Sequence, residues 1–312
     1  MACVNNQHFQ NGLLMLINSI LDAMGKTPLV RLKKMSSGNV FGKAEFLNPG
    51  GSIKDRVARH IIEQAEKKGK LKPGMTIIES TSGNTGIGLS LVGVQKGYPV
   101  ICVMPENMSV ERRKIIQAFG GEIVYTAASE SLPGCLKKMQ EIIMTDPDKY
   151  FVADQFANPD NPEIHYSQTG PEIWEDMNGE IDIFVAGVGS GGTLQGIGKF
   201  LKEKKPGVKI VAVEPKNSAA LLGREPGLHQ IQGIGDGFIP DVLDLKLVDM
   251  VFTVTDEEAI ETTRRLSREE GLLAGTSSGA NVFVALHMDN GRNKVITILP
   301  DRIERYFSTA LI

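Results

Sequence analysis

The chain has 312 residues, of which 41% are hydrophobic and 23% charged, and its formal net charge is −3. This length accommodates two α/β cores, and the lack of a dense Lys and Arg cluster excludes a nucleic-acid-binding surface. Cys3, Cys102 and Cys135 show no paired spacing and the five histidines are scattered, so neither a disulfide framework nor a metal site is expected.

The N-terminal segment indicates neither a secretory signal nor a membrane span. No Lys or Arg precedes Lys26, and Asn18 and Ser19 interrupt the short apolar run. Apolar residues from Leu13 to Leu21 repeat at helical spacing instead, which predicts a helix. We therefore expect a cytoplasmic protein.

Apolar runs of strand length alternate with helix-length periodic segments along the rest of the chain. The expected strands are 76–80, 100–105, 122–127, 181–187, 209–215, 250–255 and 294–300. Between most neighbours, apolar residues recur at helical spacing, as in Ile115, Ile116 and Phe119, and the same spacing occurs in Ile61, Ile62 and Ala65. Continuous apolar strands separated by helices predict an α/β fold of mainly parallel sheet flanked by helices. Pro and Asn interrupt the alternation at 156–165, which predicts one α/β unit before this stretch and another after it.

Four turns rich in glycine and hydroxyl residues lie where a strand or connector meets a helix. They are 48–56 ("NPGGSIKDR"), 79–88 ("ESTSGNTGIG"), 187–193 ("GVGSGGT") and 274–281 ("AGTSSGAN"). Ligands bind at the carboxyl edge of parallel sheets, so four such turns indicate one crevice that is approached from several sides. The turn at 79–88 offers hydroxyls and backbone N–H groups to a carboxylate or a phosphate, although helix capping by Ser82 or Asn84 is the simpler alternative.

Lys54 lies just beyond two glycines, at the start of an expected helix. The positive end of the helix dipole disfavours a cation there, and a neutral amine or an imine would remove that conflict. The alternative is a solvated lysine among other charges at the helix end. The two interpretations stay open on this segment alone.

The turn at 187–193 permits two interpretations. Gly187, Gly189 and Gly192 have the G-x-G-x-x-G spacing of a dinucleotide site, and Glu214 follows where its ribose ligand would lie. The same backbone donors at a helix start suit a single phosphate equally well. An NAD-dependent dehydrogenase, however, gives no role to Lys54.

Five motifs taken together resemble one family. "NPGGSIKDR", "ESTSGNTGIG", "GVGSGGTL", "IQGIGDGFIP" and "AGTSSGA" occur in the order and at the spacings of the cysteine synthase (O-acetylserine sulfhydrylase) family. That family belongs to the tryptophan synthase β-like, fold-type II pyridoxal phosphate enzymes. The resemblance extends from about Ile20 to Ile312, and the set is far more specific than any single motif.

The resemblance implies a role for each matching residue. Lys54 matches the lysine that forms the Schiff base with pyridoxal phosphate, Asn84 the group that hydrogen-bonds its ring hydroxyl, and Ser277 the hydroxyl partner of the pyridine nitrogen. The implied cofactor phosphate loop is Gly189, Ser190, Gly191, Gly192 and Thr193. The implied substrate-binding residues, most of them around the α-carboxylate, are Thr81, Ser82, Gly83, Thr85, Gln155 and Gly233. Gly187 and Glu214 then become a packing glycine and a strand-end acid.

The implied reaction is a β-replacement, in which O-acetylserine and sulfide give cysteine and acetate through an α-aminoacrylate while Lys54 moves the Cα proton. The resemblance also implies a homodimer and, in parts of the family, a serine acetyltransferase that docks in the cleft. It divides the chain into a smaller, mobile domain (54–155) and a larger domain (15–53 plus 156–312) that holds the cofactor phosphate. An inert relative that acts only as a binding partner is disfavoured by the retained Lys54, Asn84 and Ser277.

Two positions depart from the family pattern. Asp236 stands where alanine is common, and it either faces solvent without a role or activates a water that converts cysteine to serine and hydrogen sulfide. Cystathionine formation from serine and homocysteine is a further alternative on the same scaffold. Ile303 stands where the motif "LPDRIERYFS" usually has glycine, so the backbone there is not expected to follow the family's geometry.

Overall fold

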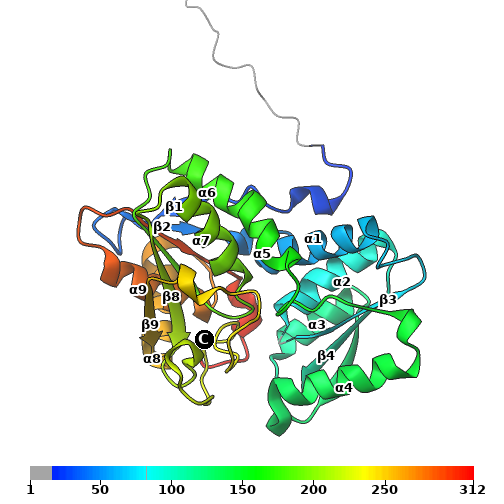
Figure 1. Ribbon diagram of the computed structural model, residues 1–312. Helices are drawn as coiled ribbons and strands as arrows, with labels where there is room; N and C mark the ends of the chain where they lie inside the picture. Colours follow the sequence, from blue (N-terminus) through cyan, green and yellow to red (C-terminus); the bar gives the residue numbers. More distant parts are fainter. Residues whose placement is uncertain (1–15, 82) are drawn as a thin grey trace, which may run out of the picture.

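The computed structural model describes residues 16–81 and 83–312, which form two sheets of mainly parallel strands flanked by helices (Figure 1). The expected α/β architecture is therefore confirmed. Cys3, Leu13 and Ser82 lie outside the described residues. Within the described ranges, no helix combines the length and the apolar character needed to cross a membrane.

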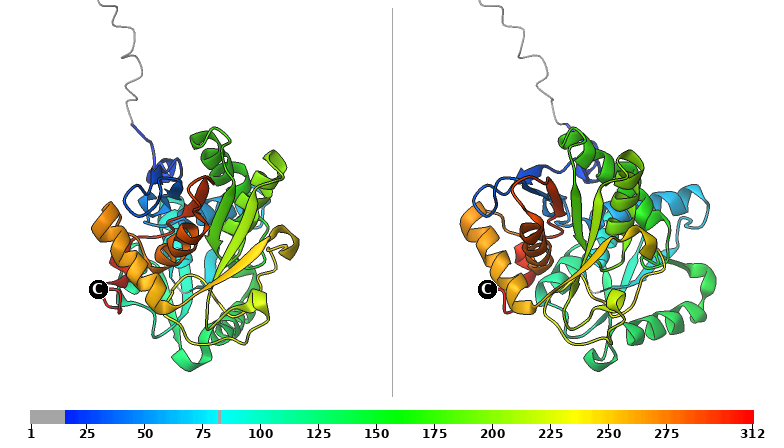
Figure 2. Two further views of the ribbon diagram at one scale, coloured as in Figure 1. Left: turned by 90° about the vertical axis from the view of Figure 1, so that its left-hand side faces the viewer. Right: turned by 60° about the vertical axis from the view of Figure 1, so that its left-hand side comes forward.

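The larger sheet has six strands in the order β1-β2-β10-β7-β8-β9, and its β1–β2 pair is antiparallel while the other neighbours are parallel. The strands are Leu29–Arg31 (β1), Val40–Lys43 (β2), Ile183–Gly187 (β7), Lys209–Pro215 (β8), Met250–Val254 (β9) and Val295–Ile298 (β10). Helices α8 (Asp256–Arg265) and α9 (Thr276–Met288) cover one face of this sheet, and α6 (Gly170–Asp176) and α7 (Gly192–Lys204) cover the other (Figure 2). Successive side chains face opposite layers: Val185 packs with α8 and α9, and Phe184 packs with α6 and α7.

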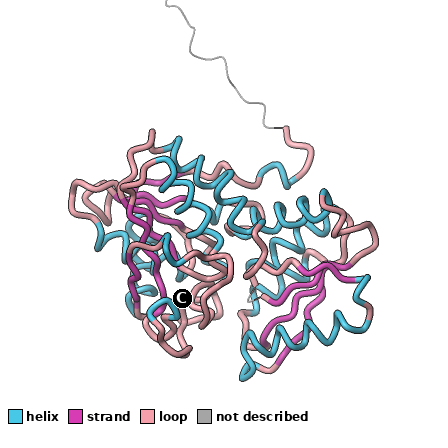
Figure 3. The backbone as a smooth tube through the Cα atoms, in the orientation of Figure 1, coloured by secondary structure: helices cyan, strands magenta, loops and turns pink. Residues whose placement is uncertain are grey.

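The smaller sheet has four parallel strands in the order β5-β4-β3-β6 (Figure 3). They are Thr76–Ser80 (β3), Val100–Pro105 (β4), Glu122–Thr126 (β5) and Tyr150–Val152 (β6). Ile78 faces α4 (Ser131–Thr145), whereas Ile77 faces α1 (Lys54–Lys67), α2 (Asn84–Lys96) and α3 (Val110–Ala118). Both faces are thus covered, as parallel sheets require.

The remaining helices connect these layers. α5 (Asp160–Ile164) continues through a π-helical turn at His165–Thr169 into α6, and α8 continues into a second π-helical turn at Leu266–Glu270. Short 3₁₀ turns occupy Ile20–Ala23, Glu45–Leu47, Ala128–Glu130, Pro147–Lys149, Ala220–Leu222, Leu245–Leu247 and Ile303–Tyr306.

All seven expected strands are present, each with ends within two residues of the prediction, whereas β1, β2 and β6 were not expected. The expected helix ending at Leu21 is wrong in its described part. Residues 16–18 are not helical, because Ser19 caps a new 3₁₀ turn through a reciprocal capping box with Asp22. The stretch 156–165 leads from β6 into α5, and the domain limits placed there stay a prediction.

Ile303 has an ordinary backbone. It is not among the described non-glycine residues with positive φ, and its N–H donates to Leu273 O at 3.2 Å. The side chain is buried with Tyr306 and Leu311. A β-branched residue is therefore accommodated without strain at the position where the resemblance gives glycine.

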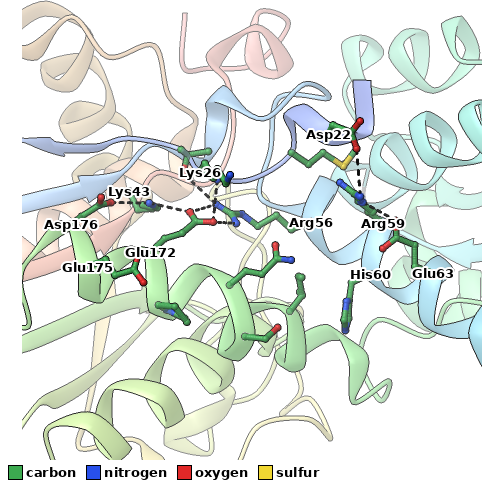
Figure 4. Close-up of a pocket in the computed structure, with 16 residues that line it drawn as sticks. Asp22, Lys26, Lys43, Arg56, Arg59, His60, Glu63, Glu172, Glu175 and Asp176 are labelled. Carbon is green, nitrogen blue, oxygen red and sulfur yellow. Dashed lines mark hydrogen bonds and ion pairs between the residues drawn. The ribbon is translucent and has the colours of Figure 1, made fainter. Parts of the chain in front are cut away.

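A polar cleft of about 660 Å³ lies along α1 and α6. Buried ion pairs lie at it: Arg56 contacts Glu172 through Nη1 at 2.7 Å, and Lys43 contacts Glu172 at 3.1 Å (Figure 4). Arg56 also contacts Glu45 through Nε at 2.8 Å. Lys43 belongs to β2 and Glu172 to α6. The network therefore fastens α1, which begins at Lys54, to elements of the larger sheet.

Replacing Arg56 by methionine is expected to lower the free energy of unfolding by about 3–5 kcal/mol, because the fully buried Glu45 would keep an unpaired charge. The matched control is Arg59→Met on the same helix, whose ion pair with Glu63 is partly exposed and should be worth less than about 1 kcal/mol. Urea unfolding measures both, and equal losses would contradict the assignment of the network.

Candidate functional site

A cavity of about 740 Å³ is lined by residues that follow the carboxyl ends of β3, β4, β7 and β10. It therefore lies where ligands of parallel sheets bind. The sequence-predicted residues that line it are Lys54, Thr81, Asn84, Thr85, Gln155, Gly189, Ser190, Gly191, Thr193, Gly233, Asp236 and Ser277. Gly83 and Gly192 are chain neighbours of lining residues, and Ser82 lies outside the described residues.

Lys54 is the first residue of α1, and its amine donates a hydrogen bond to Ser190 Oγ at 2.6 Å. Burial lowers the pKa of Lys54 to about 8, while the carboxylates of Asp236 and Glu79 oppose the shift. The N-terminal end of the α1 dipole also disfavours the ammonium form. About half of the amine is therefore neutral near pH 8. The neutral amine is the form that attacks a carbonyl carbon.

The loop from Gly189 to Thr193 is built for close backbone approach. A Cβ on Gly189 would lie 2.3 Å from Gly233 O, and one on Gly192 would lie 2.0 Å from Asn161 Oδ1. Gly191 precedes α7 with a φ of +78°. Because the first N–H groups of a helix have no intrahelical partners, this loop presents donors to an anion in the cavity.

The turn after β3 meets a segment that lies some 70 residues further along the chain. Thr85 Oγ1 donates to Gln155 Oε1 at 2.6 Å, and Thr81 Oγ1 accepts from Gly83 N at 3.0 Å. Gly83 has a φ of +139°, and a Cβ there would collide with Arg112 Cδ at 2.3 Å. The two segments thus place hydroxyl, amide and N–H groups together at the start of α2, where a carboxylate is favoured.

Ser277 lies in the first turn of α9 and is 3% exposed. Gly233 has a φ of +96°, and the loop that follows is fixed to the end of β7 because Gly235 N donates to Val188 O at 2.9 Å. Asp236 faces the cavity on this loop. The surrounding protein raises the pKa of Asp236 by desolvation, and the charges of Lys54 and His229 oppose the rise.

Two buried residues at the site were missed in the sequence. Asn161 Nδ2 donates to Gln155 O at 2.7 Å and to Ser190 Oγ at 3.0 Å, so it joins the segment of Gln155 to the loop from Gly189 to Thr193. Glu79 accepts from the N–H of Asp154 at 2.7 Å and of Gln155 at 3.2 Å. Asn161 stands among Pro and Asn residues that indicated only a boundary. Glu79 is the first residue of the motif at 79–88 and lies next to the end of a buried strand, but the motif gave this acid no role.

The dinucleotide interpretation of the loop finds no support at Glu214. Its carboxylate is 2% exposed and accepts the N–H of Leu221 at 3.2 and 3.1 Å through its two oxygens. The acid is thus occupied within the turn after β8, and it does not line the cavity. A single phosphate in the loop requires no such partner.

The residues present fit pyridoxal phosphate. The glycine loop suits its phosphate, the half-neutral Lys54 amine suits its aldehyde, and the hydroxyl of Ser277 suits its ring nitrogen. Bound pyridoxal phosphate supplies an electron sink for a carbanion on the substrate. In the described part of the chain, no three His, Cys, Asp or Glu side chains are grouped to hold a metal ion.

Comparisons with known proteins agree with this fit. The model of the family "Pyridoxal-phosphate dependent enzyme" matches residues 20–301. Cysteine synthase A of Escherichia coli is 50% identical over 300 residues, which cover 92% of this chain and 93% of that protein.

Two solved structures have nearly the same fold. The O-acetyl serine sulfhydrylase isoform 3 of Entamoeba histolytica has a TM-score of 0.91 at 44% identity, covering 98% of this chain and 94% of that one. A hydrogen sulfide-producing enzyme of Fusobacterium nucleatum has a TM-score of 0.90 at 41% identity, and the match covers 94% of this chain and 100% of that one. The fold is that of the fold-type II enzymes, and the chain belongs to the cysteine synthase family of pyridoxal-phosphate dependent enzymes.

Proposed function

We propose that this enzyme makes cysteine and acetate from O-acetylserine and sulfide by β-replacement. The observation that carries the proposal is the position of the Lys54 amine, which contacts the phosphate loop in the same cavity as the turn that suits a carboxylate. The identity with cysteine synthase A supports cysteine as the product, and the likeness to an O-acetyl serine sulfhydrylase supports this choice of substrate and nucleophile.

Each part of the cavity then has a task. Gly189, Ser190, Gly191, Gly192 and Thr193 hold the cofactor phosphate; Asn84 and Ser277 contact its ring; and Thr81, Gly83, Thr85, Gln155 and Gly233 surround the amino-acid substrate, a role that the family resemblance also assigns to Ser82. The N–H groups at the start of α2 favour the α-carboxylate electrostatically. This fixes the orientation of the substrate around its Cα.

Lys54 is the base in this proposal. Its neutral amine takes the proton from Cα, acetate leaves from Cβ, sulfide forms the new bond at Cβ, and Lys54 returns the proton to Cα. Desolvation favours this task because it lowers the pKa of the amine toward physiological pH. Ser277, a neutral hydroxyl, keeps the ring nitrogen less positive than a carboxylate would, which favours elimination and replacement over transamination.

The proposal includes a moving part and partners. We infer that the smaller domain (54–155) closes over the substrate against the larger domain (15–53 plus 156–312), since residues of both line the cavity. Homodimer formation and docking of a serine acetyltransferase rest on the family resemblance, and a cytoplasmic location rests on the character of the N-terminal segment.

One observation favours a second reaction, the hydrolysis of cysteine to serine and hydrogen sulfide. Asp236 lines the cavity, and its Oδ2 lies 3.6 Å from the position that a Cβ on Gly189 would take. A carboxylate beside the reacting centre can take a proton from water as water attacks Cβ. The likeness to the hydrogen sulfide-producing enzyme supports this alternative.

The first test is spectroscopic and enzymatic. The purified protein should be yellow, O-acetylserine should shift its visible band, sulfide should restore the band, and cysteine should accumulate. Lys54→Ala should lower the rate of cysteine formation about 10²–10⁴-fold. Lys67→Ala, an exposed lysine at the other end of α1, serves as the control. A colourless protein that cannot be reconstituted would sink the proposal.

The uptake of cofactor by the apo protein should depend on pH through Lys54. Below its pKa of about 8 the amine is mostly protonated, so the rate should fall tenfold for each pH unit and should level off above pH 8. Nα-acetyllysine serves as the reference amine: its rate at each pH is first divided by its own fraction of neutral amine, and the result corrects the protein's rates for the titration of the cofactor itself. A rise that continues to the ordinary lysine value of 10.5 would show that Lys54 is not desolvated.

Asp236→Asn should separate the two reactions. If Asp236 activates water, the formation of serine and sulfide from cysteine alone should fall about 10²-fold, a larger factor than the fall in cysteine formation from O-acetylserine. Serine and sulfide are quantified together and should be equimolar in the parent enzyme. Only traces of either product from the parent enzyme would remove the hydrolytic alternative.

A further inference from the structure

The Asn84 amide is held at both of its ends by the C-terminal segment. Its Nδ2 donates to Asp301 Oδ2 at 2.7 Å, and its Oδ1 accepts from Arg305 Nε at 2.7 Å. Asn84 lines the cavity, whereas Asp301 and Arg305 do not. The two charged residues thus act on the cavity through Asn84.

The chemistry of these partners allows one amide orientation. A carboxylate only accepts hydrogen bonds and a guanidinium only donates them. Turning the amide over would place its oxygen against the Asp301 carboxylate and its NH₂ against Arg305, and both hydrogen bonds would become repulsive contacts. The second N–H of Nδ2 therefore has a fixed direction.

Asp301 and Arg305 are themselves fixed. They are 1% and 2% exposed, and the Tyr306 hydroxyl donates to the Asp301 carboxylate oxygens at 3.1 and 2.8 Å. Arg112 of α3 lies 3.6 Å from the same carboxylate. Arg305 also donates to Gly50 O, in the turn that precedes Lys54.

The backbone around the carboxylate leaves little freedom. Gly275 N donates to Asp301 O at 2.9 Å, and a Cβ on Gly275 would lie 2.2 Å from Asp301 Oδ1. Ser52 and Asp301 form a β-bridge. Buried charges with this many partners keep a single arrangement, because any shift would leave a polar group unpaired.

We propose that Arg305 and Asp301 are positioning residues that lock the Asn84 amide, so that its remaining N–H meets the ring hydroxyl oxygen of the cofactor. This inference rests on the proposed function for the identity of the acceptor. The orientation of the amide stands on the described contacts alone.

A double-mutant cycle on cofactor affinity tests the coupling. Arg305→Lys keeps the charge but loses the planar donor, and it should weaken the binding of pyridoxal phosphate to the apo protein about 10-fold. In an Asn84→Ala background the same change should have less than a 2-fold effect. Arg302→Lys is the matched control, since Arg302 donates to Phe46 O at 2.8 Å instead, and it should stay within 2-fold.

The visible band of the loaded protein gives a second readout. Arg305→Lys and Asn84→Ala should shift the band in the same direction, and the double variant should add no further shift. Equal losses of affinity in both backgrounds would mean a general structural role and would overturn the inference.

Hydrogen exchange of the Asn84 side-chain amide, followed by NMR in the apo protein, tests the lock without the cofactor. Exchange should be slow in the parent and should accelerate at least 10-fold in Arg305→Lys and in Asp301→Asn. Unchanged exchange in both variants would overturn the lock. A parent protein that shows slow exchange but takes up no pyridoxal phosphate would instead overturn the proposed function.

Discussion

The removal of the Lys54 amine from bulk water is the constraint on which the rest of the site depends. Burial and the positive end of the α1 dipole both disfavour the ammonium form of Lys54. The carboxylates of Asp236 and Glu79 favour that form and so oppose both effects. The amine must still be reachable, so it lies at a cavity wall rather than in a core. Its contact with Ser190 sets the distance between the lysine and the loop from Gly189 to Thr193.

The rest of the molecule keeps these groups together although the chain supplies them from distant places. Lys54 begins a helix that covers the smaller sheet, while Ser190 follows β7 of the larger one. Asn161 contacts Ser190 and the backbone of Gln155, and the Arg56 ion pairs hold α1 to the opposite layer. Glycines at positions 189 and 192 are required because neighbouring backbone and side-chain atoms fill the space of a Cβ. The cavity is thus a product of packing between the two sheets.

The sequence predicted those parts of the structure that depend on local pattern. Long apolar strands such as β8 and glycine turns such as 187–193 are visible as runs of residues, and their common edge follows from parallel topology. β2 was missed because "VFGK" is short and ends in a lysine whose charge is neutralised by Glu172, 129 positions later by sequence number. Local patterns carry no information about such a partner.

The sequence also failed to predict the partners of the site residues, because these partners lie far away along the chain. Asn84 was assigned by its motif, yet the groups that orient it, Asp301 and Arg305, lie more than 200 residues away and are charged residues in a terminal segment. Charged side chains are usually exposed, and only the folded arrangement shows that these two are buried. Ile303, between them, appeared out of place in the sequence and is part of the apolar packing behind the network.

The charges of Asp236 and Lys54 each shift the pKa of the other residue, and these shifts bear on the choice between sulfide and water as the nucleophile. Desolvation raises the pKa of Asp236 and lowers that of Lys54, while the attraction between the two charges opposes both shifts. An ionised Asp236 suits the activation of water but favours the ammonium form of Lys54, which cannot accept the Cα proton. Alanine at this position would remove that attraction and leave the lysine more readily neutral. In the two proposed reactions, the Asp236 carboxylate would therefore make the removal of the Cα proton by Lys54 less easy and would supply a base for the attack of water on Cβ.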